Sequence, residues 1–272
     1  MRILHNAHSL SPNGAATTQA GCKTLCVTKR RNMRNLIIDQ GNSSSKVSVY
    51  DGDEVIFAER YEVLCPDTLQ KIRQEIGWDR SILSSVVETD GELLRWLSDH
   101  SQKFVQVDEN TPLPIGNLYK TPRTLGKDRI AVCVGAHYLC PGRNLLVIDA
   151  GTAITYDVVN SENNYVGGNI SLGVDMRFKA LNTFTSKLPL VTTEGESPLT
   201  GGNTQEAIRS GVVNGMTYEM DGFIASFRAI YPKLLVFLTG GNAKYFEKRI
   251  KYCNFVIPNL LSLGLNRILT FR

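Results

Sequence analysis

The chain has 272 residues, of which 42% are hydrophobic and 21% are charged, and its formal net charge is +4. This length and apolar content allow a substantial buried core in one large or two medium domains. No run reaches the roughly 18 apolar residues that a membrane-spanning helix needs, and the first 30 residues lack the apolar segment of a secretory signal. These features exclude an integral membrane protein, predict no membrane partner and favour a cytoplasmic location.

The positive charge is concentrated in the first 38 residues, which contain six basic residues and no acidic one. Such a stretch is compatible with binding to nucleic acid or a membrane surface, or with an organellar transit peptide. However, residues 1–32 are rich in Ser, Asn, Gly, Ala and Thr, and Met33 stands just ahead of the first apolar run. We interpret residues 1–32 as a disordered leader or the product of a misassigned start, and we expect no nucleic acid partner.

The cysteines form no CxxC pair and have no adjacent histidine ligands. Neither a zinc site nor a disulfide framework is therefore indicated, and we expect reduced thiols. The six are Cys22, Cys26, Cys65, Cys133, Cys140 and Cys253.

The first half of the chain begins with an apolar strand over 35–39. An alternating strand around Val47 and Val49 follows, then a turn and a strand over 55–58, which together predict a three-stranded antiparallel meander. Helical spacing over 68–76, a short buried strand over 81–87, a helix over 91–100 and a strand over 103–107 complete this half. Residues 110–124 contain three prolines and are predicted to form a loop.

The second half repeats this order after a helix that runs from Gly126 to about Leu139. Strands are predicted over 145–149, 153–159 and 164–170, helices over 174–182 and 203–227, and a buried strand over 234–238 ahead of a further helix. We therefore predict an α/β fold with duplicated βββαβα topology, divided into domains 33–143 and 144–272.

Each predicted meander opens with an apolar strand that ends in Asp-x-Gly. The first copy reads Asp39-Gln40-Gly41-Asn42-Ser43-Ser44-Ser45-Lys46, and the second, 110 residues later, reads Asp149-Ala150-Gly151-Thr152. A glycine turn lets backbone N–H groups and short polar side chains close on phosphate oxygens, while the carboxylate holds a cation. Taken alone, the first copy is equally compatible with a polar hairpin turn. The repeat favours a nucleotide site gripped from both sides.

Asp128 follows Gly126 and Lys127 at a loop-to-helix junction and has two interpretations. It is either an acid that stabilises the helix start or a general base that orients a substrate hydroxyl for attack on a γ-phosphoryl group. In the second interpretation Lys127 and Arg129 are free to bind an anionic substrate. The glycines of Gly240-Gly241-Asn242 fit an adenosine-binding loop and a simple turn equally well.

With these motifs in place, residues 33–272 resemble the type III pantothenate kinases of the actin-like, acetate-kinase and Hsp70 superfamily. The family pattern Asp-x-Gly-Asn-Thr/Ser matches 39–43, Asp-x-Gly-Thr-Ala matches 149–153, and Tyr, Pro and Gly-x-Asp-Arg match Tyr119, Pro122 and 126–129. Gly167-Gly168-Asn169-Ile170, Gly173, the run 185–189, Asn203-Thr204, Ala207 and Ser210-Gly211 also fit. The fold implied is two actin-like, ribonuclease H-like domains.

The resemblance implies ATP-dependent phosphorylation of pantothenate, the first step of coenzyme A biosynthesis. It assigns ATP binding to 39–46 and Thr152, and the proton acceptor to Asp128. Pantothenate contacts fall on Tyr119, Gly126, Lys127, Asp128, Arg129 and Thr204. Asp149 would bind a monovalent cation, K⁺ or NH₄⁺, and Mg²⁺ would accompany ATP. Family members are homodimers with pantothenate near the subunit interface.

Two residues depart from the family pattern: Gln40 stands where an apolar residue is common, and Leu172 replaces a proline. Neither removes a reacting group, so we expect activity. A sugar or acetate kinase of the same superfamily is the alternative enzyme, disfavoured by the match at 126–129. A non-catalytic nucleotide-sensing regulator is the alternative from another class, disfavoured because Asp39, Asp128, Asp149 and Thr152 are all present.

Overall fold

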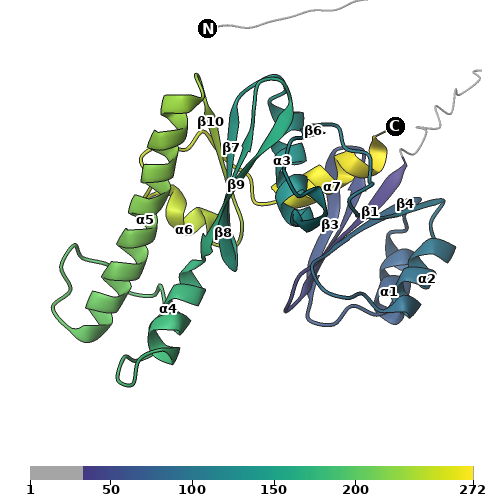
Figure 1. Cartoon of the computed structure of the whole chain (residues 1–272). Coiled ribbons are helices and arrows are strands. Elements are labelled where there is room, and N and C mark those ends of the chain that lie inside the picture. Colours follow the sequence, from purple (N-terminus) through teal and green to yellow (C-terminus); the bar gives the residue numbers. More distant parts are fainter. Residues whose placement is uncertain (1–32, 272) are drawn as a thin grey trace, which may run out of the picture. The chain divides into compact units, whose positions relative to one another are not determined.

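The computed structural model describes residues 33–271, and the predicted leader lies outside them. The described chain forms two β-sheets and seven α-helices (Figure 1). The strands of the first sheet are β1 (Arg34–Gln40), β2 (Ser45–Asp51), β3 (Glu54–Tyr61), β4 (Arg80–Ser85) and β5 (Lys103–Gln106). The strands of the second sheet are β6 (Gly116–Asn117), β7 (Leu145–Ala150), β8 (Ala153–Val159), β9 (Asn164–Leu172), β10 (Leu235–Thr239) and β11 (Phe255–Val256).

The helices lie between groups of strands along the chain, and the last one follows β11. They are α1 (Pro66–Glu75), α2 (Gly91–Asp99), α3 (Lys127–Leu139), α4 (Val174–Thr183), α5 (Thr204–Ile230), α6 (Ala243–Glu247) and α7 (Leu260–Thr270), with a 3₁₀ turn at Pro122–Thr124. None of the described helices is long and apolar enough to cross a membrane.

Both sheets repeat one strand order, which confirms the predicted duplication. The first runs β3-β2-β1-β4-β5, and the second runs β9-β8-β7-β10-β11 with β6 added outside β9. In each sheet the first three strands are antiparallel and the next two pair in parallel. The strands that end in Asp-x-Gly, β1 and β7, are therefore central. They are buried along most of their length because core side chains cover both faces of each sheet.

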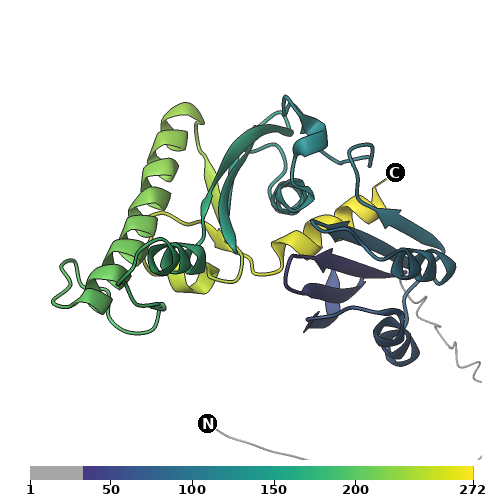
Figure 2. The ribbon, with the colours of Figure 1, turned by 60° about the horizontal axis from the view of Figure 1, so that its bottom comes forward.

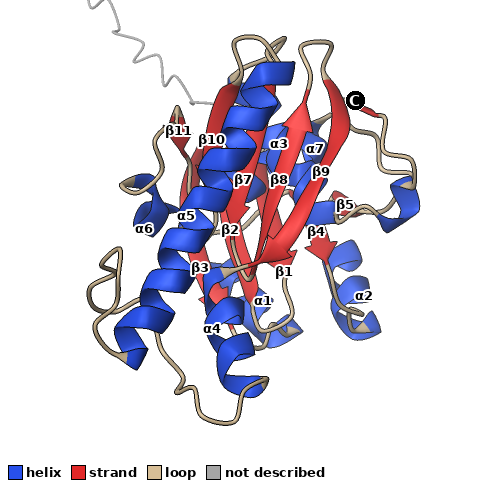
Figure 3. Cartoon of the chain, turned by 60° about the vertical axis from the view of Figure 1, so that its left-hand side comes forward, coloured by secondary structure: helices blue, strands red, loops and turns tan. Residues whose placement is uncertain are grey.

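The hydrophobic core has three parts, arranged as layers. One part joins the outer face of the first sheet to α1 and α2. Another joins one face of the second sheet to α4, α5 and α6, and α5 lies across that sheet in Figure 3. The third lies between the sheets and contains α3 and α7. Figure 2 shows the second sheet nearly edge-on, with α5 on one side and α3 on the other.

Each helix of the central layer packs on the sheet formed by the other half of the chain. α3 packs on β7 and β8 of the second sheet, whereas α7, at the end of the chain, packs on β1 and β4 of the first. The division at residue 143 stays a prediction. Any domain boundary has to take into account that α3 and α7 each pack on the sheet of the other half.

The structure contains three elements that the sequence analysis did not predict: β6, β11 and α7. β6 and β11 are two-residue strands, formed by pairing with β9 and β10 rather than by local preference. The predicted loop 110–124 is otherwise irregular apart from the 3₁₀ turn. The other predicted strands and helices are confirmed, with ends displaced by at most three residues.

Candidate functional site

The first Asp-x-Gly motif forms the hairpin between β1 and β2. The Gly41 N–H donates to the Ser44 carbonyl at 3.0 Å and closes the turn. Asp39 lies opposite Lys46 in the antiparallel register, with Lys46 Nζ 4.0 Å from Asp39 Oδ2. The predicted loop thus brings a carboxylate, an ammonium and the exposed Asn42 and Ser43 to one end of the sheet.

Alternation along β1 separates Asp39 from Gln40. Asp39 shares a face with Ile37, which packs in the central layer, while Gln40 shares a face with Ile38, which packs toward α1 and α2. Gln40 Oε1 accepts hydrogen bonds from Ser85 at 3.0 Å and Thr89 at 2.8 Å. The Gln40 side chain is therefore directed away from the central layer, which leaves its backbone for any contact with ATP.

The second motif forms the turn between β7 and β8, where Thr152 is exposed. Gly240, at the end of β10, closes on this turn with a φ of 93°, and a Cβ on it would lie 2.3 Å from Asp149 Oδ1. A side chain at this position would therefore enter the space beside Asp149. Gly240 thus has a structural reason to be glycine, and the adenosine-loop interpretation stays a prediction.

Asp128 lies in the first turn of α3, whose N-cap is Gly126. Its Oδ1 accepts the backbone N–H of Arg129 at 2.8 Å, so it uses one lone pair locally and stabilises the helix start. Its charge also raises the pKa of both Asp39 and Asp149. The three carboxylates that the sequence analysis selected therefore influence one another electrostatically, although among residues 33–271 they do not form a group arranged to hold a metal ion.

Burial is the main reason why two of these carboxyl groups are difficult to ionise. It raises the pKa of Asp39 to about 6, with Lys46 opposing the shift and Asp128 adding to it. It raises the pKa of Asp149 to about 7, again opposed by Lys46 and increased by Asp128 and Asp39. The cluster thus has more negative charge than Lys46 compensates, which favours a bound cation.

The oxygen atoms around Asp149 fit a hard cation. A Cβ on Gly240 would meet both Asp149 Oδ1 and the Ala150 carbonyl, so these oxygens approach the same small space. Carboxylate and carbonyl oxygens suit Mg²⁺ and other hard cations. No group of three His, Cys, Asp or Glu side chains among residues 33–271 is arranged to hold a metal ion, so a cation here requires further oxygens from backbone, water or phosphate.

Arg129 is not free, in contrast to the expectation from sequence. Its Nε and Nη2 donate to Asp157 Oδ1 at 2.9 and 2.7 Å, and the two side chains are 6% and 0% exposed. Tyr165 Oη donates to the same oxygen at 2.8 Å, and Thr155 Oγ1 donates to Oδ2 at 2.9 Å. Burial raises the pKa of Asp157, and these donated hydrogen bonds oppose the shift. The reason for the difference is that α3 packs on the second sheet, where the Arg129 side chain reaches Asp157 of β8.

The remaining predicted acceptor-binding residues lie on two parts of the fold. Tyr119, after β6, is half-buried, with its ring centre 5.8 Å from the Arg129 guanidinium carbon, and Lys127 opens α3. Thr204 is the exposed first residue of α5, after the N-cap Asn203. The structure brings Tyr119, Lys127, Asp128 and Arg129 together, whereas no hydrogen bond in the described chain connects Thr204 to them.

Asp157 and Tyr165 are site-adjacent residues to which the sequence analysis gave no role. The available signal was an acid within the otherwise apolar run Ile154 to Val159, because a buried charge in a strand requires a partner. The alternation of β8 directs Thr155 and Asp157 toward α3, and Tyr156 toward α5.

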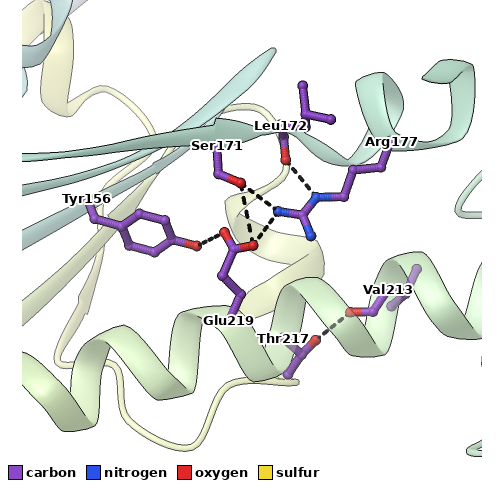
Figure 4. A network of polar contacts seen from close by, with 7 residues as sticks. All are labelled: Tyr156, Ser171, Leu172, Arg177, Val213, Thr217 and Glu219. Carbon is purple, nitrogen blue, oxygen red and sulfur yellow. Dashed lines mark hydrogen bonds and ion pairs between the residues drawn. The ribbon is translucent and has the colours of Figure 1, made fainter.

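Tyr156 belongs to a second polar network on the opposite face, drawn in Figure 4. Glu219 of α5 accepts hydrogen bonds from Tyr156 at 2.8 Å and from Arg177 of α4 at 2.6 Å. Arg177 also donates to Ser171 at 3.1 Å and to the Leu172 carbonyl at 2.7 Å. This network fixes the end of β9 against α4 and α5.

A cavity of about 320 Å³ opens beside the first turn. Ile37, Ala58, Leu261, Lys46 and Arg60 are among its lining residues. Arg60 Nε donates to Ser44 Oγ at 2.7 Å, so the cavity edge and the turn are connected. The space adjoins Asp39 and can extend the phosphate-binding region.

Comparison with known proteins gives a consistent result. The sequence model for type III pantothenate kinase matches residues 35–226. The chain is 44% identical to a type III pantothenate kinase of Phocaeicola vulgatus over 237 residues, which is 87% of this chain and 98% of that protein. It is 44% identical to a type III pantothenate kinase of Cytophaga hutchinsonii over 237 residues, covering 87% and 99% of the two chains.

Solved structures establish the fold class. A protein of Campylobacter jejuni described as a conserved Baf family transcriptional activator aligns with a TM-score of 0.57 and 21% identity, over 86% of this chain and 96% of that one. A glucokinase from an Antarctic psychrotroph aligns with a TM-score of 0.53 and 10% identity, over 87% and 98%. At these identities the likeness concerns the fold alone, and it confirms the predicted actin-like architecture.

Proposed function

The chain belongs to the type III pantothenate kinase family, and on that premise we propose that it transfers the γ-phosphoryl group of ATP to the hydroxyl group of pantothenate. The observation that supports the proposal is the placement of Asp39 and Asp149 at the ends of the duplicated strands, with Asp128 in the first turn of α3, where the three influence one another electrostatically. Phosphoryl transfer needs a positioned hydroxyl, a base and neutralised phosphate charge. In the proposal Asp128 is the base, and Asp39 and Asp149 attract the cations that neutralise phosphate charge.

In this proposal the two glycine turns hold ATP from opposite sides. The turn of residues 39–46 binds phosphate oxygens through the backbone N–H groups of 42–44 and the Lys46 ammonium, and Thr152 binds them from the second turn. Lys46 supports this role because its side chain is 63% exposed, its ammonium lies 4.0 Å from Asp39, and its charge lowers the pKa of both Asp39 and Asp149. Asp128 accepts the proton of the attacking hydroxyl, for which the loose transition state requires only a weak base.

The cation requirement follows from the charge of the site. Bound Mg²⁺ neutralises phosphate charge, and a monovalent cation, K⁺ or NH₄⁺, would be held by Asp149 with neighbouring carbonyl oxygens. The burial that raises the pKa of Asp149 supports this assignment, because a carboxylate in that environment gains most from a cation.

Acceptor binding falls to the residues around the start of α3. Tyr119, Gly126, Lys127 and Arg129 bind pantothenate beside Asp128, and Thr204 contributes from the start of α5. Arg129 holds the acceptor carboxylate with the part of its guanidinium group that Asp157 does not occupy.

A homodimer is part of the proposal. Large apolar side chains are exposed on β9, on α5 and in the segment that connects α4 to α5, and a monomer gains nothing from exposing them. The residues are Ile170, Leu172, Phe184, Leu190, Leu199 and Tyr218. Light scattering of the purified chain should give twice the mass of one chain, and Phe184→Ser with Leu199→Ser should lower it. A wild-type monomer at micromolar concentration would contradict the dimer.

The proposal places the enzyme in the cytoplasm, and ADP release by the full chain is the direct test of its activity. The assay contains ATP and Mg²⁺, with pantothenate present or absent, and with K⁺ or Na⁺ as the monovalent salt. We expect release that needs pantothenate and is stimulated by K⁺. Release that a sugar or acetate supports instead would indicate the alternative enzyme, and ATP binding without turnover would favour the regulator.

A further inference from the structure

Asp157 is the most completely bonded carboxylate near the proposed acceptor site. It stands in a central strand of the second sheet, is fully buried and accepts four hydrogen bonds from three side chains. These side chains come from α3, β8 and β9, so Asp157 joins the start of α3 to two strands. An ion pair in this setting is held in one geometry, because each partner would otherwise be a buried, unpaired charge.

The geometry of the pair leaves one side of the guanidinium group without a charged partner. Nε and Nη2 of Arg129 are bonded to Asp157, whereas Nη1 forms no ion pair within the described chain. The hydrogen bond between the Arg129 and Tyr119 side chains is among the interactions that raise the pKa of Arg129. Tyr119 covers the group, with its ring centre 5.8 Å from the guanidinium carbon, and Tyr165 meets the Tyr119 ring edge-on at 5.9 Å. Asp157 therefore determines the direction in which Nη1 points.

Gly168 shows how closely the pair is confined. A Cβ at this position would lie 2.5 Å from Asp157 Oδ1 and 2.8 Å from Arg129 Nη2. The backbone of β9 therefore forms a wall of the ion pair, and the guanidinium group has no room to turn toward that strand. The bonds to Asp157 and the Tyr119 ring oppose rotation of the group away from this geometry.

We propose that Asp157 is a positioning residue for acceptor recognition: it holds Arg129 by one edge so that the remaining edge meets the carboxylate of the acceptor. Asp157 itself touches no substrate. It acts through Arg129 and gives the enzyme its preference for an acidic acceptor over a neutral one. Thr155 and Tyr165 hold Asp157 in turn. This inference rests on the proposed function, because it presumes that pantothenate is the acceptor.

A purely structural ion pair would behave differently from a positioning pair. Loss of a structural pair lowers the stability of the fold and affects both substrates together. Loss of a positioning pair raises the KM for an acceptor that carries a carboxylate, and it leaves the KM for ATP and the kcat nearly unchanged. Selectivity between pantothenate and pantothenol, in which the carboxylate is replaced by a hydroxymethyl group, reports on positioning and not on stability.

The test is Asp157→Asn, which keeps the shape of the side chain and removes its charge. We expect the KM for pantothenate to rise about 10- to 100-fold, the range for a charge-assisted hydrogen bond, and the preference for pantothenate over pantothenol to fall by the same factor. The KM for ATP and kcat should stay within about threefold of wild type. A folded Asp157→Asn enzyme with unchanged preference would overturn the inference.

Two further variants separate folding from positioning. Glu219→Gln weakens the partly buried ion pair of the other face, and it should lower thermal stability without changing the preference. Tyr165→Phe removes one hydrogen bond to Asp157 and should reduce the preference about threefold, even where Asp157→Asn fails to fold. An unchanged preference in Tyr165→Phe overturns the inference in that case. Wild-type protein without pantothenate-dependent turnover overturns the proposed function, whereas active wild type with unaltered variants overturns this inference alone.

Discussion

The ammonium of Lys46 lies 4.0 Å from Asp39 Oδ2, across the register pair that closes the first glycine turn. The Lys46 side chain is 63% exposed, and an ion pair of this kind contributes only about 0 to 1 kcal/mol to stability. Yet Lys46 is the group that lowers the pKa of both Asp39 and Asp149. The lysine therefore acts on the electrostatics of the site rather than on the stability of the fold.

Replacing this lysine should affect ATP and not folding. In Lys46→Met the KM for ATP should rise about tenfold, because one charge-assisted contact to phosphate is lost. The melting temperature should change little, since the ion pair is exposed. Steady-state kinetics and a thermal melt measure the two quantities, and Lys71→Met, on the exposed side of α1, is the matched control. A wild-type KM for ATP in Lys46→Met would remove Lys46 from the phosphate site.

Asp128 offers a test of the proton-acceptor role. Asp128→Asn keeps the hydrogen bond from the Arg129 N–H but loses the basic oxygen, so turnover should fall by about 10²-fold or more. ATP binding, measured by calorimetry, should be retained or strengthened, because one of the carboxylates that repel phosphate is neutralised. Near-normal turnover would show that Asp128 only stabilises the start of α3.

The sequence predicts those parts of the fold that local pattern determines. The uniform apolar run into Asp39 and its repeat at Asp149 require central strands, and both are found. β6 and β11 were not predicted, because two residues carry no periodicity and pair only when the sheet edge is already present. α7 shows that a helix at the end of the chain can pack on the first sheet.

Within the site, the sequence identifies residue types but not the direction of their side chains. Gln40 stands between two predicted ligands, and only the burial of its neighbours shows that it faces α1 and α2. The sequence around Arg129 does not show that it is bonded, because its partner, Asp157, is 28 residues away and on another element. This partnership follows from the packing of α3 on β8, which local sequence patterns do not specify.

The raised pKa of Asp39 makes the free energy of unfolding depend on pH. Burial raises its pKa from 3.8 to about 6, so the folded state keeps this proton between those values while the unfolded state loses it. Stability from this group is therefore complete below about pH 4, falls as pH rises to about 6 and is constant above. Asp39→Asn mimics the protonated form, so it should raise the melting temperature at pH 8 by about 3 °C, as about 1 kcal/mol does in a chain of this size. At pH 4.5 most of this gain in melting temperature should disappear. An equal gain at pH 4.5 and pH 8 would contradict the raised pKa of Asp39.

Gly168 and Gly222 provide a matched pair of glycine replacements. A Cβ on Gly168 would lie 2.1 Å from the Tyr156 carbonyl and would also meet the Arg129–Asp157 pair, none of which can move without breaking strand or ion-pair bonds. Gly168→Ala should therefore lower the free energy of unfolding by about 2 to 3 kcal/mol, the cost of overpacking. Gly222 lies on the exposed side of α5 with no atom within 4 Å of an added Cβ, so Gly222→Ala should raise that free energy by about 0.5 to 1 kcal/mol. Urea denaturation of both variants measures the two values. Equal effects of the same sign would mean that backbone entropy, and not the close contact at Gly168, determines the choice of glycine there.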